Sequence, residues 1–451
     1  MTPDQIESAV RAAMPQAIED LKRLAAIPSV AFPGHPEEPV YAAASLTEEL
    51  LRSAGLPRVQ QVQVDGSFPA IYGEAPAPPG MPTVLLYAHY DVQPAGDPAA
   101  WRTPPFEPTL IDGRLYGRGC ADDKSGVISH IAALRTFQGR FPVGIKVIIE
   151  GQEEYAGERL EAFVERNPDL LRADAIVVAD TGNPRVGDPA VTTSLRGMAA
   201  FTIEVRTLQG AVHSGSFGGA APDALAALMR MLTSLHGDNG DIRVPGLPRG
   251  AFLGQGPSEE EFRKTAGVLE GVSLVGSGSL ADRLWSSYAI TVTGLDVPSV
   301  SGAVNAVQPA ARARVTVRVP PAGDPKTTVN AVVEFLRQVA PWGVQVSFGD
   351  FTVGSGFQAD SGGKARAALN RAMEWAFGRP PRDVGAGGSI PLVNTLLKQF
   401  PAAEILLFGA EDEDAAIHAP NERVDLEELR KVVTTEALFL HELSLPSALG
   451  V

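Results

Sequence analysis

The sequence predicts an α/β protein with a central, mostly parallel sheet, into which a smaller α+β domain is inserted. Short apolar runs alternate with segments of helical periodicity in the first part of the chain, which is typical of a sheet with helices on both faces. From about residue 191 the strands instead alternate polar and apolar residues, and the first pattern resumes near residue 359. A chain of 451 residues also exceeds the usual size of a single hydrophobic core.

Residues 1–192 are expected to alternate between helices and buried strands. Thr2 and Gln5 form a capping box, which predicts that a helix begins the chain. Further along, the apolar runs predict strands and the helical spacing predicts helices. The expected strands are 84–88, 145–149 and 175–179, and the expected helices are 124–137 and 157–167.

Residues 193–358 are expected to form the inserted domain, in which helices cover one face of an antiparallel sheet. Its predicted strands are 199–206, 289–293, 312–319 and 344–348, and its predicted helices are 222–235 and 327–339. Residues 359–451 are expected to return to the first domain. They contain a predicted helix at 364–377, a strand at 405–408 and a last helix at 425–443.

The composition argues against several classes of partner. The chain has 38 Lys and Arg against 53 Asp and Glu, a net charge of −15, whereas binding to a phosphate backbone needs a basic surface. The N-terminus, MTPDQIESAV, resembles no signal peptide, and no uncharged stretch of about 18 residues occurs. Cys120 is the only cysteine. We therefore expect a cytoplasmic protein that binds neither nucleic acid nor membrane, and whose metal ligands, if any, are histidine and carboxylate.

Polar residues of one chemical kind follow each buried strand of the α/β part. Ligands of open α/β sheets bind outside the carboxyl ends of the strands, so these side chains are expected to converge. Each of them alone would more often be a turn former or helix cap, and their joint placement carries the prediction. Imidazoles and carboxylates without thiolates suit zinc, manganese or a similar divalent ion, and without a cation they would be a costly cluster. The residues after the strands are His89, Asp91, Glu153, Glu154 and Asp180. Asp122 and Asp123 come just before a predicted helix, and His418 lies near the C-terminus.

These motifs occur in one order along essentially the whole chain. They are His89-Tyr-Asp91-Val-Gln-Pro, Gly117-Arg-Gly-Cys-Ala-Asp122-Asp123-Lys124, Glu153-Glu154, Asp180, His213-Ser-Gly and His418. As a set they are highly specific, and the chain resembles the co-catalytic di-zinc exopeptidases. That family includes carnosinases and other dipeptidases, carboxypeptidase G, succinyl-diaminopimelate desuccinylase and acetylornithine deacetylase.

The resemblance implies two divalent ions as cofactors, zinc in the first place, with manganese or cobalt as alternatives. Asp122 would bridge the two ions. Glu154 and His418 would hold one of them. His89 and Asp180 would hold the other. These ligands would make residues 1–192 and 359–451 the catalytic domain.

The resemblance also implies what the residues beside the ions do. Glu153 would be the general base that takes the proton of the attacking water. Asp91 would orient the imidazole of His89, as metal-bound histidines generally require. The peptide bond between Asp122 and Asp123 would be cis.

Four further residues match substrate contacts of the family. His213 would donate to the developing oxyanion and Asn305 would contact the substrate, both from the neighbouring subunit of a homodimer, so the inserted domain would be a lid and dimerisation domain. Arg318 would bind the substrate carboxylate, and Ser389 would lie in a substrate-contacting loop. The structural alternatives are a plain loop connection for His213, a turn former for Asn305, a surface ion pair for Arg318 and a helix cap for Ser389.

Details of the motifs resemble those of the carnosinase and dipeptidase branch of this family. The sequence has Asp122-Asp123-Lys124, an aspartate at position 180, and Gly388-Ser389-Ile390-Pro391. We therefore predict hydrolysis of dipeptides or short peptides that carry a free C-terminal carboxylate. Asn305 departs from that branch, whose nearest members carry threonine there. An N-acyl-amino-acid deacylase or a carboxypeptidase of the same family is the alternative, and a non-catalytic binding protein on this fold is less favoured.

Overall fold

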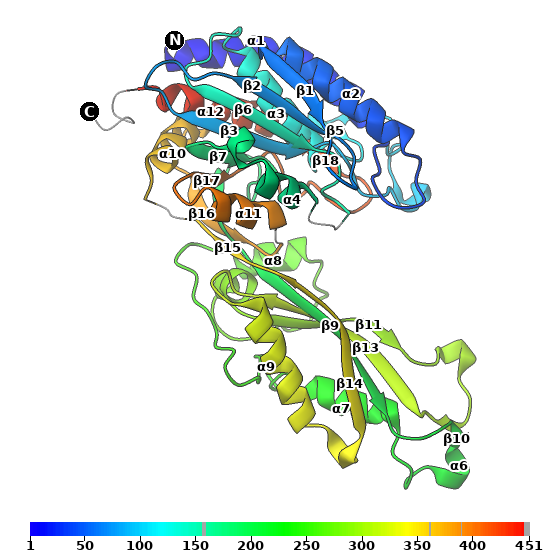
Figure 1. The fold of residues 1–451 in the computed structure, drawn as a ribbon. Coiled ribbons are helices and arrows are strands. Elements are labelled where there is room, and N and C mark those ends of the chain that lie inside the picture. Colours follow the sequence, from blue (N-terminus) through cyan, green and yellow to red (C-terminus); the bar gives the residue numbers. More distant parts are fainter. Residues whose placement is uncertain (156–158, 360–361, 389, 446–451) are drawn as a thin grey trace. The chain divides into compact units, whose positions relative to one another are not determined.

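The computed structural model describes residues 1–155, 159–359, 362–388 and 390–445. The chain forms two compact units, which Figure 1 traces in sequence colours. The first unit comprises Met1–Thr193, Ala359–Val384 and Pro391–Val451, and the second comprises Ser194–Gln358 and Gly385–Ile390. The second unit is therefore an insertion in the chain of the first.

A mixed sheet with the strand order β1-β2-β6-β3-β7-β17-β8 is the framework of the first unit. The central strands are parallel: β6 (Gly144–Glu150), β3 (Thr83–His89), β7 (Ala175–Val178) and β17 (Glu404–Leu407). Antiparallel strands flank them: β1 (Arg58–Val62), β2 (Ala70–Ala75) and β8 (Ala190–Leu195). The predicted α/β class is confirmed, and the parallel part of the sheet is its centre.

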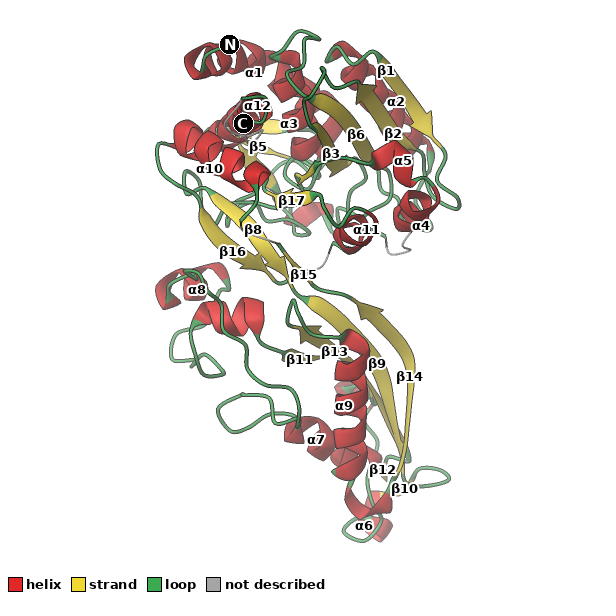
Figure 2. Ribbon diagram, turned by 60° about the vertical axis from the view of Figure 1, so that its left-hand side comes forward, coloured by secondary structure: helices red, strands yellow, loops and turns green. Residues whose placement is uncertain are grey.

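Helices cover both faces of this sheet, which is why most residues of its central strands are apolar and buried (Figure 2). One face carries α1 (Pro3–Ala25), α3 (Lys124–Arg135), α10 (Lys364–Phe377) and α12 (Leu426–Glu442), which pack against one another. The other face carries α4 (Arg159–Arg166) and α11 (Pro391–Gln399), which also pack together. Helix α1 begins with the predicted capping box, in which the side chains of Thr2 and Gln5 each accept a backbone N–H of the other residue.

Smaller elements complete the first unit. Helix α2 packs on β1 and β2, and a short sheet has the order β18-β5-β4. The bounds of these elements are α2 (Glu38–Ser53), β4 (Thr109–Ile111), β5 (Arg114–Tyr116) and β18 (Arg423–Asp425). The unit also contains α5 (Pro168–Leu171) and the first residues of β16 (Arg382–Ala386). Among the described residues, no helix is both long and apolar enough to cross a membrane.

The parallel strands end at a common edge of the sheet. His89 ends β3 opposite Glu150 at the end of β6. Strand β7 lies between β3 and β17, and its chain continues beside that of β17 up to a parallel bridge between Gly182 and Glu411. Because parallel strands direct their carboxyl ends to the same edge, the polar residues that follow them collect there.

The second unit is an antiparallel sheet with helices on one face, which confirms the predicted α+β arrangement. The strand order is β11-β13-β9-β14, with bounds β9 (Gly197–Arg206), β11 (Ala289–Asp296), β13 (Ala310–Val319) and β14 (Gln345–Gly354). Helices α7 (Ala224–Ser234) and α9 (Pro325–Gln338) pack on the apolar face of β9 and β13. The remaining α-helices and strands are β10 (Val212–His213), α6 (Ser214–Phe217), α8 (Glu259–Thr265), β12 (Ala306–Val307) and β15 (Phe357–Gln358).

Candidate active site

The residues predicted to be metal ligands lie together at the carboxyl edge of the central strands. The Nε2 atom of His89 is 3.1 Å from Oδ1 of Asp122 and 3.9 Å from Oδ1 of Asp180. The Nε2 atom of His418 is 3.0 Å from Oδ2 of Asp122 and 3.1 Å from Oε2 of Glu154. Asp122 therefore stands between the two imidazoles and presents one carboxylate oxygen to each. A carboxylate that bridges two ions requires this arrangement.

Most of the predicted ligands lie at or near the end of a regular element. His89 is the last residue of β3, Asp180 follows β7, and Glu154 follows β6. Asp122 lies in the turn before α3. His418 lies in the loop between β17 and β18, with φ at 58°, a left-handed conformation that non-glycine residues seldom adopt. Such backbone values recur at functional sites, where surrounding structure holds them in place.

Asp91 contacts both His89 and the segment that follows β6. Its Oδ1 lies 3.3 Å from Nδ1 of His89. Its two carboxylate oxygens also accept the backbone N–H groups of Glu153 and Glu154, at 3.0 and 3.1 Å. A proton on Nδ1 of His89, facing Asp91, leaves the Nε2 lone pair directed at Asp122 and Asp180. Asp91 thus contacts the ring of His89 and the backbone of Glu153 and Glu154.

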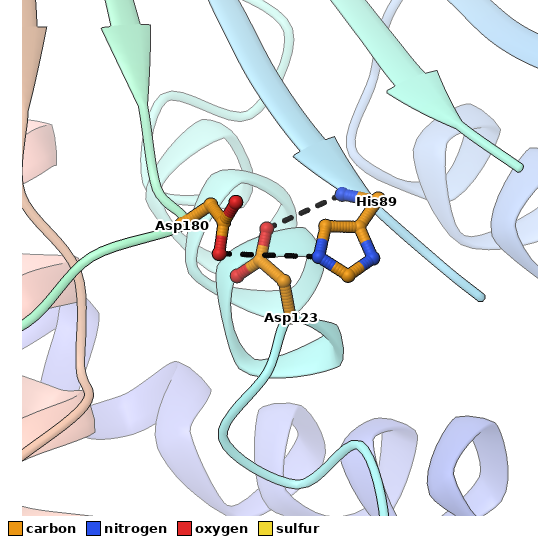
Figure 3. Close-up of side chains that lie close together, drawn as sticks. All are labelled: His89, Asp123 and Asp180. Atoms are coloured by element: carbon orange, nitrogen blue, oxygen red, sulfur yellow. Dashed lines mark hydrogen bonds and ion pairs between the residues drawn. The ribbon is translucent and has the colours of Figure 1, made fainter. Parts of the chain in front are cut away.

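Asp123 is a member of the site to which the sequence analysis assigned no function. Its Oδ2 accepts the backbone N–H of His89 at 3.2 Å, and its carboxylate lies beside Asp180 (Figure 3). The peptide bond between Asp122 and Asp123 is cis, as the resemblance implied. Asp123 therefore ties the turn before α3 to the end of β3.

Glu411 also lies in the site, and it was not predicted from the sequence. It follows β17, and one of its carboxylate oxygens lies within 4.8 Å of ligand atoms of Asp122 and Asp180. The signal for it was present, because the predicted strand 405–408 is followed by GAED just as the other strands are followed by acids. Asp180 was predicted because it follows an apolar strand, and Glu411 also follows one.

The donor atoms of the site fit a divalent ion. They form three overlapping groups, each with one ligand atom per residue and all atoms within 4.8 Å of one another: His89, Asp123 and Asp180; Asp122, Glu154 and His418; Asp122, Asp180 and Glu411. Within the described ranges, the buried Nε2 of His89 and Oδ1 of Asp123 have no hydrogen-bond partner. Nitrogen and carboxylate oxygen donors of this kind suit zinc or manganese.

Burial raises the pKa of several carboxyl groups in the site. Loss of solvation, with contributions from neighbouring carboxylates such as Asp91, raises the pKa of Glu153 to about 7. Loss of solvation also raises the pKa of Asp180 and of Glu411 well above the ordinary values, and Asp122 adds to both shifts. A group of ionised carboxylates in this environment is therefore unfavourable unless positive charge offsets it.

The two imidazoles supply part of that positive charge. Hydrogen bonds to Asp122 and Glu154 raise the pKa of His418 to about 10. Burial alone would raise the pKa of Asp122, but the contacts with the imidazoles of His418 and His89 outweigh it and lower that pKa. Divalent cations would offset the same carboxylates and would bind the imidazoles in their neutral form.

Two neighbouring contacts stabilise the segment that carries Glu153 and Glu154. The amide of Gln93 donates to Oε2 of Glu154 at 2.7 Å. The hydroxyl of Tyr87 donates to Oε2 of Glu150 at 2.8 Å, and both residues are buried. Glu150 therefore has a structural hydrogen bond beneath the site.

The predicted substrate residues His213, Asn305 and Arg318 belong to the second unit, and Ser389 lies outside the described residues. His213 ends β10, is exposed, and accepts the backbone N–H of Gly215 on Nδ1 at 3.1 Å. The backbone carbonyl of Asn305 accepts the N–H of the residue after His213 at 2.9 Å. The second unit thus brings His213 and the segment of Asn305 together.

Arg318 lies on the sheet face of the second unit that faces away from the apolar core. It pairs with Met198 of β9 and with Ala289 of β11. Arg196 lies near it, and burial together with the charge of Arg318 lowers the pKa of Arg196 to about 10. Two guanidinium groups in proximity favour an anion between or beside them.

A comparison with protein families identifies the chain's relatives. The model described as Peptidase family M20/M25/M40 matches residues 85–442. The cysteinylglycine-S-conjugate dipeptidase of Corynebacterium striatum is 43% identical over 366 residues, which cover 80% of this chain and 80% of that protein. The Beta-Ala-His dipeptidase of Rattus norvegicus is 29% identical over 378 residues, which cover 79% of this chain and 76% of that protein.

Solved structures share the fold over almost the entire chain. Human carnosine dipeptidase 1 superimposes with a TM-score of 0.81 at 25% identity, covering 98% of this chain and 99% of that one. The di-peptidase Dug1p of Saccharomyces cerevisiae superimposes with a TM-score of 0.80 at 23% identity, covering 99% of both chains, and this second likeness concerns the fold alone.

Proposed function

Because the chain belongs to the peptidase family M20/M25/M40, we propose that it is a metal-dependent dipeptidase that hydrolyses the amide bond of dipeptides or short peptides with a free C-terminal carboxylate. The observation that carries this proposal is the position of Asp122 between His89 and His418, with one carboxylate oxygen 3.1 Å or less from each Nε2. Such a centre is suited to a pair of divalent ions rather than to a structural ion pair.

The proposed cofactors are two divalent ions, zinc in the first place, with manganese or cobalt as alternatives. Asp122 would contact both ions. Glu154 and His418 would hold one, and His89 and Asp180 would hold the other. When bound, such ions lower the pKa of water and polarise an amide carbonyl. Support comes from the nitrogen and oxygen donors of the site and from the buried Nε2 of His89, which has no hydrogen-bond partner in the described part of the chain.

Glu153 is the proposed general base. Its carboxylate would take the proton of the attacking water and then deliver it to the nitrogen of the broken amide bond. Its pKa of about 7 allows both transfers near neutral pH, because a group with this pKa gains and loses a proton readily there. Asp91, which accepts the backbone N–H of Glu153, would hold it in place.

The second unit is proposed to be a lid and dimerisation domain that contributes to substrate binding. Arg318 would bind the substrate carboxylate, Ser389 would contact the substrate, and His213 and Asn305 would act in the neighbouring subunit of a homodimer. Support for dimerisation comes from β11, which is an edge strand with the exposed apolar residues Val292 and Leu295 and is followed by exposed Val300 and Val304.

The names of the relatives narrow the proposed substrate class. One acts on cysteinylglycine S-conjugates and others on Beta-Ala-His or Cys-Gly, so we propose dipeptides rather than N-acyl amino acids. A cytoplasmic location is part of the proposal, since the thiol of Cys120 is free and buried and suits a reducing compartment.

A substrate panel with added zinc or manganese tests this function. The panel contains Cys-Gly, an S-alkylated Cys-Gly, Beta-Ala-His, an N-acetyl amino acid and an N-succinyl amino acid. We expect cleavage of the dipeptides and its loss on chelation. Cleavage confined to the N-acyl compounds would establish the deacylase alternative instead.

A further inference from the structure

Glu422 is a buried carboxylate that joins the loop of His418 to the turn of Asp122. It lies four residues after His418 and directly before β18, and its side chain has no exposed surface. Its Oε1 atom accepts the backbone N–H groups of Ala121 and Asp122, at 2.9 and 3.0 Å. These bonds span 301 and 300 residues of the chain. A residue beside one proposed ligand thus holds the backbone of another.

The other oxygen of Glu422 is bound by a buried arginine. The Nη1 atom of Arg118 donates to Oε2 of Glu422 at 2.6 Å, and the side chain of Arg118 is only 2% exposed. Arg118 also lies over the ring of Trp101, with 5.3 Å between Cζ and the ring centroid. The backbone carbonyl of Glu422 accepts the N–H of Gly117 at 2.9 Å. Glu422 therefore bonds to both ends of segment 117–122, and both of its carboxylate oxygens act as acceptors.

The loop that carries His418 has a backbone that needs such contacts. His418 has φ at 58° and Asn421 has φ at 68°, values that persist where the surrounding structure holds them. The side chain of Asn421 accepts the N–H of Arg102 at 2.5 Å and donates to the carbonyl of Ala100 at 3.1 Å. Asn421 thus attaches the loop to segment 100–102, and Glu422 attaches it to the turn of Asp122.

The bonds of Glu422 require a carboxylate rather than an amide. Its Oε1 faces two backbone N–H groups and its Oε2 faces the guanidinium of Arg118, so every neighbour is a donor. Glutamine has one acceptor oxygen and one NH₂ group, and in either orientation its NH₂ would face a donor. A buried donor that meets another donor is unfavourable, so the amide would release one of the two sides.

We propose that Glu422 is a positioning residue that holds the backbone of Asp122 so that its carboxylate reaches both imidazoles at once. The two oxygens of Asp122 lie 3.1 Å from Nε2 of His89 and 3.0 Å from Nε2 of His418. A backbone shift of Asp122 would move its carboxylate away from at least one of these rings. Partners that orient ligands in this way govern metal binding. The inference rests on the proposed pair of ions and concerns how they share Asp122.

Cobalt binding and spectroscopy test this inference without an activity assay. Full-length wild type and Glu422→Gln are depleted of metal and titrated with Co²⁺, and EPR spectra are recorded at saturation. Two Co²⁺ ions that share a bridging ligand couple magnetically, which lowers the EPR intensity per ion. We expect Glu422→Gln to bind the second Co²⁺ about 10- to 100-fold more weakly than wild type and to lose most of the coupling.

Glu428→Gln is the matched control. Glu428 is a buried glutamate of the same unit, and it accepts the side-chain amide of Asn183 at 2.6 Å and the N–H of Gly187 at 2.8 Å. Neither partner is a proposed metal ligand. Glu428→Gln should therefore lower the Tm of the metal-free protein as Glu422→Gln does, because both replacements disturb buried hydrogen bonds. Its Co²⁺ affinities and magnetic coupling should equal those of wild type.

A second replacement covers the case in which Glu422→Gln does not fold. Glu422→Asp keeps the charge opposite Arg118, but its side chain is one methylene shorter and cannot reach both sides. We expect its coupling to lie below that of wild type. Coupling equal to that of wild type in Glu422→Asp, when Glu422→Gln does not fold, would overturn the inference.

The remaining outcomes separate the inference from the proposed function. Wild-type affinity and coupling in Glu422→Gln would overturn the positioning role and leave the proposed function intact. Equal losses of coupling in Glu422→Gln and Glu428→Gln would show general destabilisation and overturn it as well. Wild type that binds no Co²⁺ would refute the proposed metal-dependent function itself.

Discussion

The carboxylate of Asp91 and the imidazole of His89 are in direct contact, with 3.3 Å between Oδ1 and Nδ1, and neither side chain has any exposed surface. The same carboxylate accepts the backbone N–H groups of Glu153 and Glu154. One side chain therefore orients an imidazole and positions the two adjacent glutamates. This relationship explains how residues about sixty positions apart hold a fixed geometry.

Replacement of Asp91 by asparagine should weaken metal binding. Asparagine retains the size of the side chain but loses the charge, and its NH₂ group would face a backbone N–H. We expect metal affinity and kcat/KM to fall about 10- to 100-fold, which is typical of lost partners of metal-bound histidines. Metal content after dialysis and kcat/KM on a dipeptide measure the effect. Asp169→Asn, an exposed surface change, is the control, and unchanged metal affinity in Asp91→Asn would contradict the orienting role.

Replacement by glutamine should have different effects at the adjacent residues Glu153 and Glu154. Glu153→Gln removes the proposed base, so kcat should fall by about 10²- to 10⁴-fold while metal content stays near that of wild type. Glu154→Gln weakens a proposed ligand, so metal content should fall together with activity. Elemental analysis measures the metal content of both variants, and steady-state kinetics measures their kcat. Substantial turnover by Glu153→Gln would show that another group takes the proton.

The pH dependence of kcat/KM should have an acidic limb set by Glu153. A general base acts in its deprotonated form, so activity rises as pH increases through the pKa of that group. Burial places that pKa at about 7, and bound cations favour the carboxylate form, so the limb should lie at or below about pH 7. Glu153→Asp should move or abolish the limb. A wild-type profile that stays flat down to about pH 4 would exclude Glu153 as the titrating base.

Periodicity along the chain predicts most of the regular elements. The helix predicted at 364–377 is α10 (Lys364–Phe377), and the strand predicted at 312–319 lies within β13 (Ala310–Val319). These elements can be predicted because burial on one or both faces requires apolar residues at particular positions. Their bounds shift by a residue or two because hydrogen bonding extends into neighbouring residues.

The site was predictable only in part. The carboxyl ends of parallel strands lie at one edge of a sheet. Residues at or just after the end of an apolar strand, such as His89 and Asp180, can therefore be placed at that edge from the sequence alone. The bond from the His89 N–H to Asp123 spans 34 residues and depends on how α3 packs on β3, which no local pattern contains. Glu411 is different. It follows a predicted strand and could have been placed at the same edge, but it belongs to none of the motifs on which the family resemblance depends.

Arg318 should determine recognition of the substrate carboxylate. On its sheet face, Arg312 forms an ion pair with Asp350, whereas Arg318 has no carboxylate partner within the described residues and lies near Arg196. Arg318→Ala should therefore raise KM about 10- to 100-fold for a dipeptide with a free carboxylate. This is the change expected from the loss of one charge-assisted hydrogen-bonded contact, and kcat should change less. For the same dipeptide with an amidated C-terminus, KM should change little. Arg312→Ala is the matched control, and equal effects of the two variants would place carboxylate recognition elsewhere.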